Sequence, residues 1–222
     1  MGRALRKELA LRTGRLMFIT HPNNQNSLQE QLEGYVKGGG RLLQVRLKGV
    51  PKEELRRVVD RIVGVMDDLG GSVIVNDNWE VALATNAWGV HIGQKDGDPI
   101  KVRKLIGDNM VLGVTVNTVQ QLLALKDAPI DYVGLGPFRF TRTKENLASI
   151  LGLEGIRQAV TEARDAGVTH PIFVIGGVES IDVRPLLSLG VHGVAVSGSI
   201  ASATDPAFAT QKFLESIEKI LR

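Results

Sequence analysis

The sequence has no cysteine, and this absence excludes disulfide bonds, thiolate nucleophiles and thiolate-bound metals. Aromatic residues make up only 5% of the 222 residues and basic residues form no obvious stripe, so we do not expect nucleic-acid binding. No apolar run reaches the roughly 20 residues of a transmembrane helix, and none has the form of a signal peptide. The net charge is only +3, which suits small anionic ligands. These absences favour a globular cytoplasmic protein with no membrane partner.

What is present fits one domain with a large core. Hydrophobic residues make up 43% of the chain and charged residues 23%, which is ordinary for a globular protein. Residues 1–14 carry several basic side chains and no long apolar run, so we expect a solvated basic leader there. No change of composition marks a linker in the rest, and residues 15–222 are expected to form a single catalytic domain.

Short apolar runs alternate along the chain with longer amphipathic stretches. The runs are rich in Val, Ile or Leu, as the buried strands of a parallel sheet are. We expect strands at Leu16–Thr20, Leu42–Arg46, Ser72–Asn76, Gly89–Gly93, Val111–Val116, Tyr132–Gly136, Pro171–Gly176 and Gly193–Ser197. Helical spacing is clear in four sets: Leu28, Leu32, Tyr35 and Val36; Leu55, Val58, Val59, Ile62 and Val65; Ile156, Ala159, Val160 and Ala163; and Phe213, Ile217 and Ile220.

Strands that each precede a helical pattern predict an α/β fold, a single (β/α)8 TIM barrel. Glycines at 38–40, 70–71 and 190 stand where helices should end, because glycine permits a left-handed cap. The alternative is a doubly wound open sheet. That fold usually has fewer strands and a glycine-rich first turn, and residues 20–24 (THPNN) contain no glycine.

Functional groups of such a barrel lie at the carboxyl ends of its strands. At the end of the second strand, Gln44, Arg46 and Lys48 alternate with apolar residues, so their side chains point to one side. Burying two unpaired cations is costly, so this pattern indicates an anion in the barrel mouth. The alternative is that Arg46 and Lys48 lie beyond the strand and point into water.

Two aspartates follow neighbouring strands. Asn76 and Asp77 end the third strand, and Asp96 follows the fourth. Carboxylates that converge beside cations suit a Mg²⁺ ion that also binds phosphate oxygens. The alternative for each aspartate is that it caps the helix that follows.

Hydroxyl groups and one further cation follow the next two strands. Thr115 ends the fifth strand, where it could equally be a β-branched residue without a chemical role. Thr141, Thr143 and Lys144 lie in a long irregular segment after the sixth strand. Such segments are often lids or binding loops, although a charged surface loop without function is the alternative.

Glycines follow the last two strands. Gly177, and Ser197 with Gly198, would let the backbone approach a phosphate closely. The alternative is that these turns need glycine only for a positive φ. With the charged groups above, the residues indicate one site for a metal-bound diphosphate and one for a monophosphate. Because a neutralised diphosphate is a good leaving group, the two ligands could be joined.

These motifs together resemble the thiamine phosphate synthase family over essentially the whole chain. The stretches that carry the resemblance are QVRLK (Gln44–Lys48), IVND (Ile74–Asp77), GVHIGQKD (Gly89–Asp96), DYVGLGPFRFTRTK (Asp131–Lys144), ILGLEGI (Ile150–Ile156), IGGV (Ile175–Val178) and GVAV (Gly193–Val196). Each motif is weak by itself, whereas seven in order at strand ends are specific.

The resemblance implies a transferase that couples hydroxymethylpyrimidine diphosphate to hydroxyethylthiazole phosphate by a dissociative, Mg²⁺-assisted reaction. It implies that Gln44 contacts the pyrimidine, that Asp77 and Asp96 bind Mg²⁺, and that a homodimer could form. The implied diphosphate-binding residues are Arg46, Lys48, Asn76 and Lys144, and the implied thiazole phosphate-binding residues are Thr141, Thr143, Gly177, Ser197 and Gly198. Arg46, Lys48, Thr115 and Lys144 are the expected catalytic residues.

Two other functions stay open. A related thiazole tautomerase depends on a histidine beyond the fifth strand, where this chain has Asn117. A non-catalytic barrel that binds phosphate ligands is the third possibility, because fold alone does not specify activity. The chain also departs from the family pattern at His21, Asn78, Thr115, Arg142 and Ser197–Gly198, which bears on phosphate binding more than on the reaction.

Overall fold

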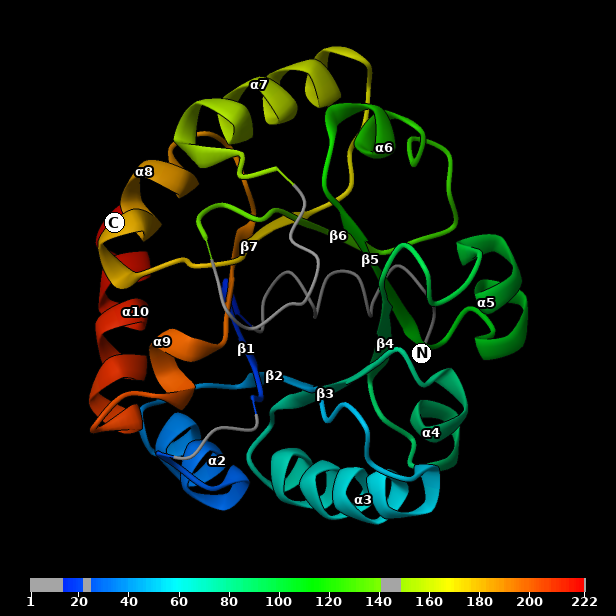
Figure 1. Ribbon diagram of the computed structural model, residues 1–222, viewed down its shortest axis with the longest axis vertical. Coiled ribbons are helices and arrows are strands. Elements are labelled where there is room, and N and C mark those ends of the chain that lie inside the picture. Colours follow the sequence, from blue (N-terminus) through cyan, green and yellow to red (C-terminus); the bar gives the residue numbers. More distant parts are fainter. Residues whose placement is uncertain (1–13, 22–24, 141–148, 222) are drawn as a thin grey trace.

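The computed structural model describes residues 14–21, 25–140 and 149–221. Parallel strands β1 to β8 close into a barrel in sequence order, and the helices form a ring around it (Figure 1). The strands are β1 (Leu16–Ile19), β2 (Leu42–Val45), β3 (Ser72–Asn76), β4 (Gly89–Ile92), β5 (Val111–Val116), β6 (Tyr132–Leu135), β7 (Ile172–Ile175) and β8 (Gly193–Val196). The predicted (β/α)8 TIM barrel is therefore confirmed.

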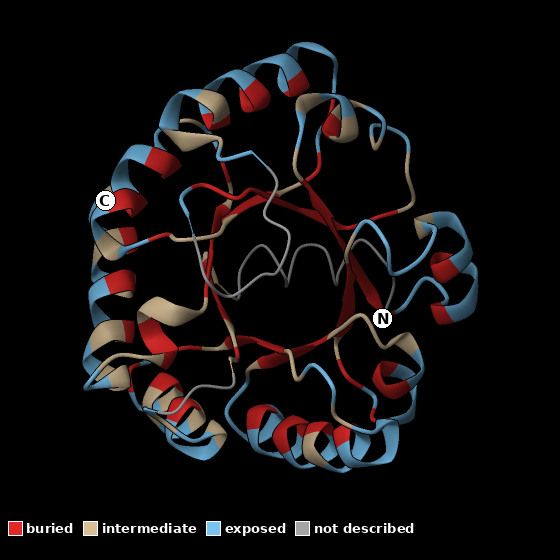
Figure 2. Cartoon of the chain, in the orientation of Figure 1, coloured by how far each residue is buried: buried red, intermediate tan, exposed pale blue. Residues whose placement is uncertain are grey.

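The helices follow the strands as the sequence predicts. They are α2 (Leu28–Lys37), α3 (Lys52–Asp68), α4 (Trp79–Ala84), α5 (Pro99–Ile106), α6 (Val119–Leu123), α7 (Gly152–Asp165), α8 (Val183–Leu187), α9 (Gly198–Ala201) and α10 (Pro206–Leu221), with a 3-10 turn η1 (Ser180–Asp182) before α8. Their buried residues face the barrel and their exposed residues face outward (Figure 2). One residue of the apolar helical pattern does not lie on the buried face: Val65 of α3 is 53% exposed. Met66, four residues after Ile62, takes the buried position instead.

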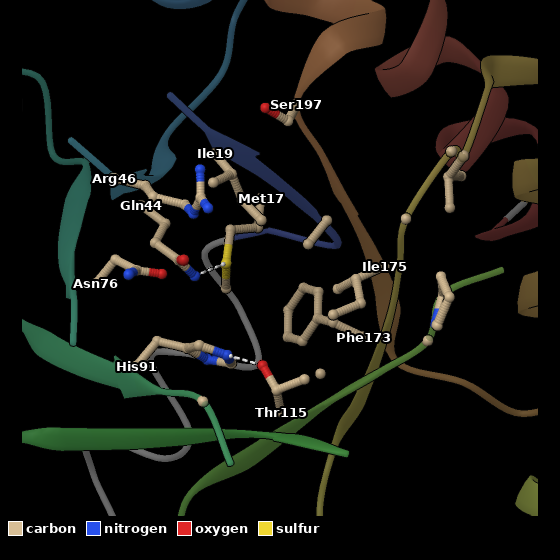
Figure 3. Close-up of a pocket in the computed structure, with 18 of the residues that line it drawn as sticks. Met17, Ile19, Gln44, Arg46, Asn76, His91, Thr115, Phe173, Ile175 and Ser197 are labelled. Atoms are coloured by element: carbon tan, nitrogen blue, oxygen red, sulfur yellow. Dashed lines mark hydrogen bonds between the residues drawn. The ribbon is translucent and has the colours of Figure 1, made fainter. Parts of the chain in front are cut away.

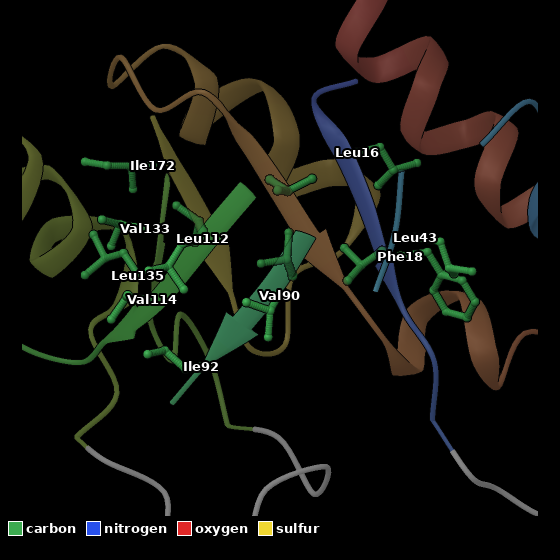
Figure 4. Close-up of a cluster of buried hydrophobic side chains, with 14 of the residues drawn as sticks. Leu16, Phe18, Leu43, Val90, Ile92, Leu112, Val114, Val133, Leu135 and Ile172 are labelled. Atoms are coloured by element: carbon green, nitrogen blue, oxygen red, sulfur yellow. The ribbon is translucent and has the colours of Figure 1, made fainter. Parts of the chain in front are cut away.

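Side chains point alternately outward and inward along each strand, and they form two separate hydrophobic clusters. Side chains such as Phe18, Leu43 and Val90 point outward into the main cluster between strands and helices (Figure 4). Met17 and Phe173 belong to a second, smaller cluster inside the barrel. Because successive strand residues point to opposite faces, the inner set is confined to one residue in two.

A buried ion pair joins α5 to the start of β6. Arg103 Nη2 donates to Asp131 Oδ2 at 2.5 Å, and both side chains are less than one-tenth exposed. The guanidinium also donates to the carbonyls of Gly107, Met110 and Pro129 at 2.7–2.8 Å. These bonds compensate the desolvation of the cation, which is otherwise unfavourable in a protein interior.

The described ranges contain no helix that is both long and apolar enough to cross a bilayer. Residues 1–13 of the expected basic leader lie outside the described residues, so only Gly14 of that segment is placed. The parallel strands all end on the same rim of the barrel, where they bring distant parts of the sequence together.

Candidate active site

A cavity of about 230 Å³ opens at the carboxyl ends of the strands, and every strand contributes to its lining. Figure 3 shows side chains from β1, β2, β3, β4, β5, β7 and the end of β8 turned toward it. The sequence-predicted residues that line it are Gln44, Arg46, Lys48, Asn76, Asp77, Asp96, Thr115, Gly177, Ser197 and Gly198. Thr141, Thr143 and Lys144 lie outside the described residues.

Asp77 and Asp96 lie close enough to interact. Burial raises the pKa of Asp77, and the Asp96 carboxylate raises it further, while a hydrogen bond from Lys48 opposes the shift. Lys48 Nζ forms an ion pair with Asp77 Oδ2. Asp96 Oδ2 accepts the Gly93 N–H at 3.1 Å, and a Cβ at Gly93 would approach that oxygen to 2.6 Å. Glycine at 93 is therefore needed for this placement of Asp96.

Neither aspartate caps the following helix through its side chain. Asn78 Oδ1 accepts from Val81 N–H at 3.1 Å and caps α4, and Asp98 Oδ1 accepts from Ile100 N–H at 2.9 Å and caps α5. The capping alternative is thus wrong for Asp77 and for Asp96.

This carboxylate pair fits a Mg²⁺ ion. Mg²⁺ takes oxygen ligands and commonly uses one or two carboxylates together with phosphate oxygens and water. A cation between the two carboxylates would relieve the repulsion that adds to the effect of burial on the pKa of Asp77. Among the described residues no group of three or more His, Asp or Glu could hold a metal, so a substrate would have to supply further ligands.

The backbone of Arg46 is held by hydrogen bonds, and Arg46 lines the cavity. The Arg46 N–H donates to Thr20 Oγ1 at 2.8 Å, and the Thr20 hydroxyl donates to the Arg46 carbonyl at 3.2 Å. No ion pair of Arg46 occurs within the described ranges, and its charge helps to lower the pKa of His21 after the larger effect of burial. The cation is therefore available to an anionic ligand.

The cavity floor holds a buried polar chain that the sequence interpretation missed. His91 Nδ1 lies 2.8 Å from the Tyr132 hydroxyl, and His91 Nε2 lies 2.7 Å from Thr115 Oγ1. A Cβ at Gly113 would lie 2.1 Å from the Tyr132 ring, so glycine makes room for that ring. The position of His91 between outward-pointing Val90 and Ile92 could have indicated its inward direction.

Thr115 thus has a defined polar role, as a partner of His91, rather than only a strand propensity. Gln44 Nε2 contacts Met17 Sδ at 3.5 Å on the same floor. Met17, Tyr132 and Phe173 give the floor an apolar, partly aromatic surface. Such a surface suits a flat ring whose polar edge meets a few side chains.

Backbone groups dominate the opposite side of the cavity. Gly177 has a φ of 69°, so its glycine is explained by conformation. Gly198 is different, because it has no positive φ and a Cβ there would meet nothing within 4 Å. Its lack of a side chain leaves open space beside the start of α9, where the first N–H groups of a helix have no intrahelical partner. An anion could approach the backbone at this point.

Residues 16–200 match the model of a protein family that is described as thiamine monophosphate synthase. This chain belongs to the thiamine monophosphate synthase family. Among curated members, a thiamine-phosphate synthase of Phocaeicola vulgatus is 35% identical over 203 residues, which cover 91% of this chain and 98% of the relative. One of Bacteroides thetaiotaomicron is 35% identical over 207 residues, covering 93% and 99%.

A solved structure of thiamine phosphate pyrophosphorylase from Pyrococcus furiosus has a TM-score of 0.83 with this chain at 27% identity. The match covers 98% of this chain and all of the other. The family predicted from the motifs is therefore confirmed, with the barrel and the transferase class that it carries. The individual roles of the site residues stay predictions.

Proposed function

We propose that this protein is a thiamine phosphate synthase that joins hydroxymethylpyrimidine diphosphate to hydroxyethylthiazole phosphate and releases pyrophosphate. The observation that carries the proposal is the cluster of Arg46, Lys48, Asp77 and Asp96 on one side of a single cavity, opposite the glycine-containing turns after β7 and β8. Two anionic ligands can bind there side by side.

In the proposed reaction, the pyrimidine methylene C–O bond breaks and its electron pair leaves with pyrophosphate. The thiazole nitrogen lone pair then forms the new C–N bond, so no proton changes place. Mg²⁺, held by Asp77 and Asp96, would neutralise charge on the departing diphosphate. Arg46 and Lys48 would stabilise the same charge as it grows, and Asn76 would donate a hydrogen bond to it.

The cavity floor would orient the pyrimidine. Gln44 and the hydroxyl of Thr115 would meet polar atoms of the ring, while Met17 and Phe173 would pack against its faces. Holding the reacting carbon near the thiazole nitrogen lowers the entropic cost of joining them. An apolar floor also keeps water from the electron-deficient carbon.

The monophosphate would bind between the Gly177 turn and the start of α9, with Ser197 and the backbone of Gly198 as donors. Thr141 and Thr143 are proposed as further ligands of the monophosphate, and Lys144 as a further ligand of the diphosphate. Location in the cytoplasm and assembly as a homodimer are further parts of it, and size-exclusion chromatography with light scattering tests the dimer.

The deciding experiment measures pyrophosphate release with both substrates and Mg²⁺. We expect Asp77→Asn to lower kcat/KM by at least about a hundredfold, because a metal ligand and a nearby negative charge are lost. Asp98→Asn is the matched control: this carboxylate caps α5, asparagine caps equally well, and activity should be unchanged.

The other two functions give different results in this assay. Conversion of the thiazole between tautomers without pyrophosphate release would indicate the tautomerase. Tight binding of both phosphates by the wild type without any turnover would indicate a binding barrel.

A further inference from the structure

Two residues after β6 hold three successive carbonyl groups at the end of β7. The Phe138 N–H donates to the Ile175 carbonyl and the Arg139 N–H donates to the Gly176 carbonyl, both at 2.9 Å. The Arg139 side chain continues this pattern, because its Nη1 donates to the Gly177 carbonyl at 2.7 Å. The turn that lines the cavity is thus tied to the segment that leads into residues 141–148.

Asp182, in η1, anchors the Arg139 guanidinium. Arg139 Nη1 and Nη2 donate to the two Asp182 carboxylate oxygens at 2.8 and 2.9 Å, a bidentate pair. Asp182 is buried and also accepts the Glu179 N–H at 2.8 Å. Hydrogen bonding to Asp182 raises the pKa of Arg139, so the guanidinium stays charged. The two hydrogen bonds to Asp182 fix the position of the Arg139 guanidinium, although 45% of the Arg139 side chain is exposed.

The carbonyls of Gly177 and Val178 accept hydrogen bonds from side chains, whereas the N–H groups of these two residues have no partner among the described residues. The Val178 carbonyl accepts from Ser199 Oγ at 2.7 Å. Within the described part of the chain, neither the Gly177 N–H nor the Val178 N–H donates a hydrogen bond, and both residues line the cavity. Val178 is 2% exposed, and a buried N–H without a protein partner is rare unless a ligand or water accepts from it.

We propose that Arg139 is a positioning residue for the monophosphate site. In a planar trans peptide, the Val178 N–H points opposite to the Gly177 carbonyl that Arg139 holds. By holding the Gly177 carbonyl, Arg139 thereby keeps the Val178 N–H directed to the anion and the Gly177 carbonyl directed away from it. Glycine at 177 makes rotation of this peptide group easy, so the constraint has to come from a side chain. This inference rests on the proposed function and assigns part of its phosphate recognition to a residue that does not touch the substrate.

The test compares Arg139→Met with the wild type by two measurements, calorimetric binding of inorganic phosphate and steady-state kinetics. We expect phosphate affinity to fall about tenfold, and KM for the thiazole phosphate to rise by a similar factor, as for a lost hydrogen bond to a charged group. KM for the pyrimidine diphosphate should stay within about twofold, because its proposed site lies on the opposite side of the cavity. Arg139→Lys should be intermediate, since an ammonium cannot reproduce the bidentate fork.

Arg157→Met is the control, because it breaks an exposed ion pair with Glu154 on α7 that does not contact the turn. Unchanged phosphate affinity in Arg139→Met, or an equal rise in both KM values, would overturn the inference. If Arg139→Met does not fold, Arg139→Lys carries the same comparison of the two KM values. Failure of the wild type itself to bind inorganic phosphate would instead remove the proposed monophosphate site, and the inference with it.

Discussion

Asp77 and Asn78 are neighbours in the chain but have separate tasks. Asn78 caps α4 with its side chain, while the Asp77 carboxylate faces Lys48 and the cavity. Asp77 has a φ of 63°, a conformation that is unfavourable for residues with a Cβ. Aspartate adopts this left-handed conformation more readily than most residues that have a Cβ.

Gly198 and Gly177 both line the cavity but differ in backbone conformation, because only Gly177 has a positive φ. We expect Gly198→Ala to leave the free energy of unfolding within about 0.5 kcal/mol of the wild type, since a surface change without strain has little effect. Phosphate affinity should nevertheless fall, because the added methyl group occupies the open space of the cavity rim.

Gly177→Ala should behave in the opposite way in urea unfolding. Its φ is 69° and its Cβ would lie 2.8 Å from Arg139 Cβ, so a loss of about 1 to 3 kcal/mol is expected. Equal stability losses for the two alanine variants would contradict this account of the glycines.

Below the site, helix α5 and strands β5 and β6 are held together by a buried ion pair and its hydrogen bonds as well as by apolar packing. The Arg103 side chain joins the end of α5 to the loop before β5 and to Asp131, just before β6. Asp131 Oδ2 also accepts the Leu112 N–H of β5 at 2.9 Å. One buried pair therefore sets the spacing of a helix and two strands.

We expect Arg103→Met to lower the free energy of unfolding by about 3 to 5 kcal/mol, because it leaves a buried carboxylate without its cation. Lys52→Met is the control, since its ion pair with Glu80 is about half exposed and should contribute at most about 1 kcal/mol. Urea denaturation followed by circular dichroism measures both. Similar losses in the two variants would contradict a buried role for Arg103.

Partial burial of a histidine makes the stability of the whole molecule depend on pH. The His192 ring packs edge-on against Phe173, with ring centroids 5.1 Å apart. Burial, and then the charge of Arg15, lower the pKa of His192 from 6.5 to about 4. The folded protein therefore keeps this ring neutral at pH values where the unfolded chain binds a proton.

Stability from His192 should be complete above pH 6.5 and should be lost as the pH falls toward about 4. The loss attributable to this ring is roughly 2 to 3 kcal/mol, from the size of the shift and allowing for partial exposure. Urea unfolding of the wild type and of His192→Gln between pH 7.5 and 4.5 measures it. The variant should show a flatter dependence, and parallel curves would contradict the prediction.

The amino-acid sequence alone was enough to predict the barrel and to place Arg46, Lys48, Asp77 and Asp96 at the carboxyl ends of its strands. These features are local, since strand alternation, helix spacing and strand-end motifs involve residues close together in the chain. The three-dimensional fold was needed to show which side chains meet. Asp77 interacts with Asp96 while Asn78 and Asp98 cap helices, His91 joins Thr115 to Tyr132, and Arg139 binds Asp182. Those pairings form because the closed barrel brings residues from different βα units together. The spacing of residues along the sequence does not show which of these side chains meet or in what orientation.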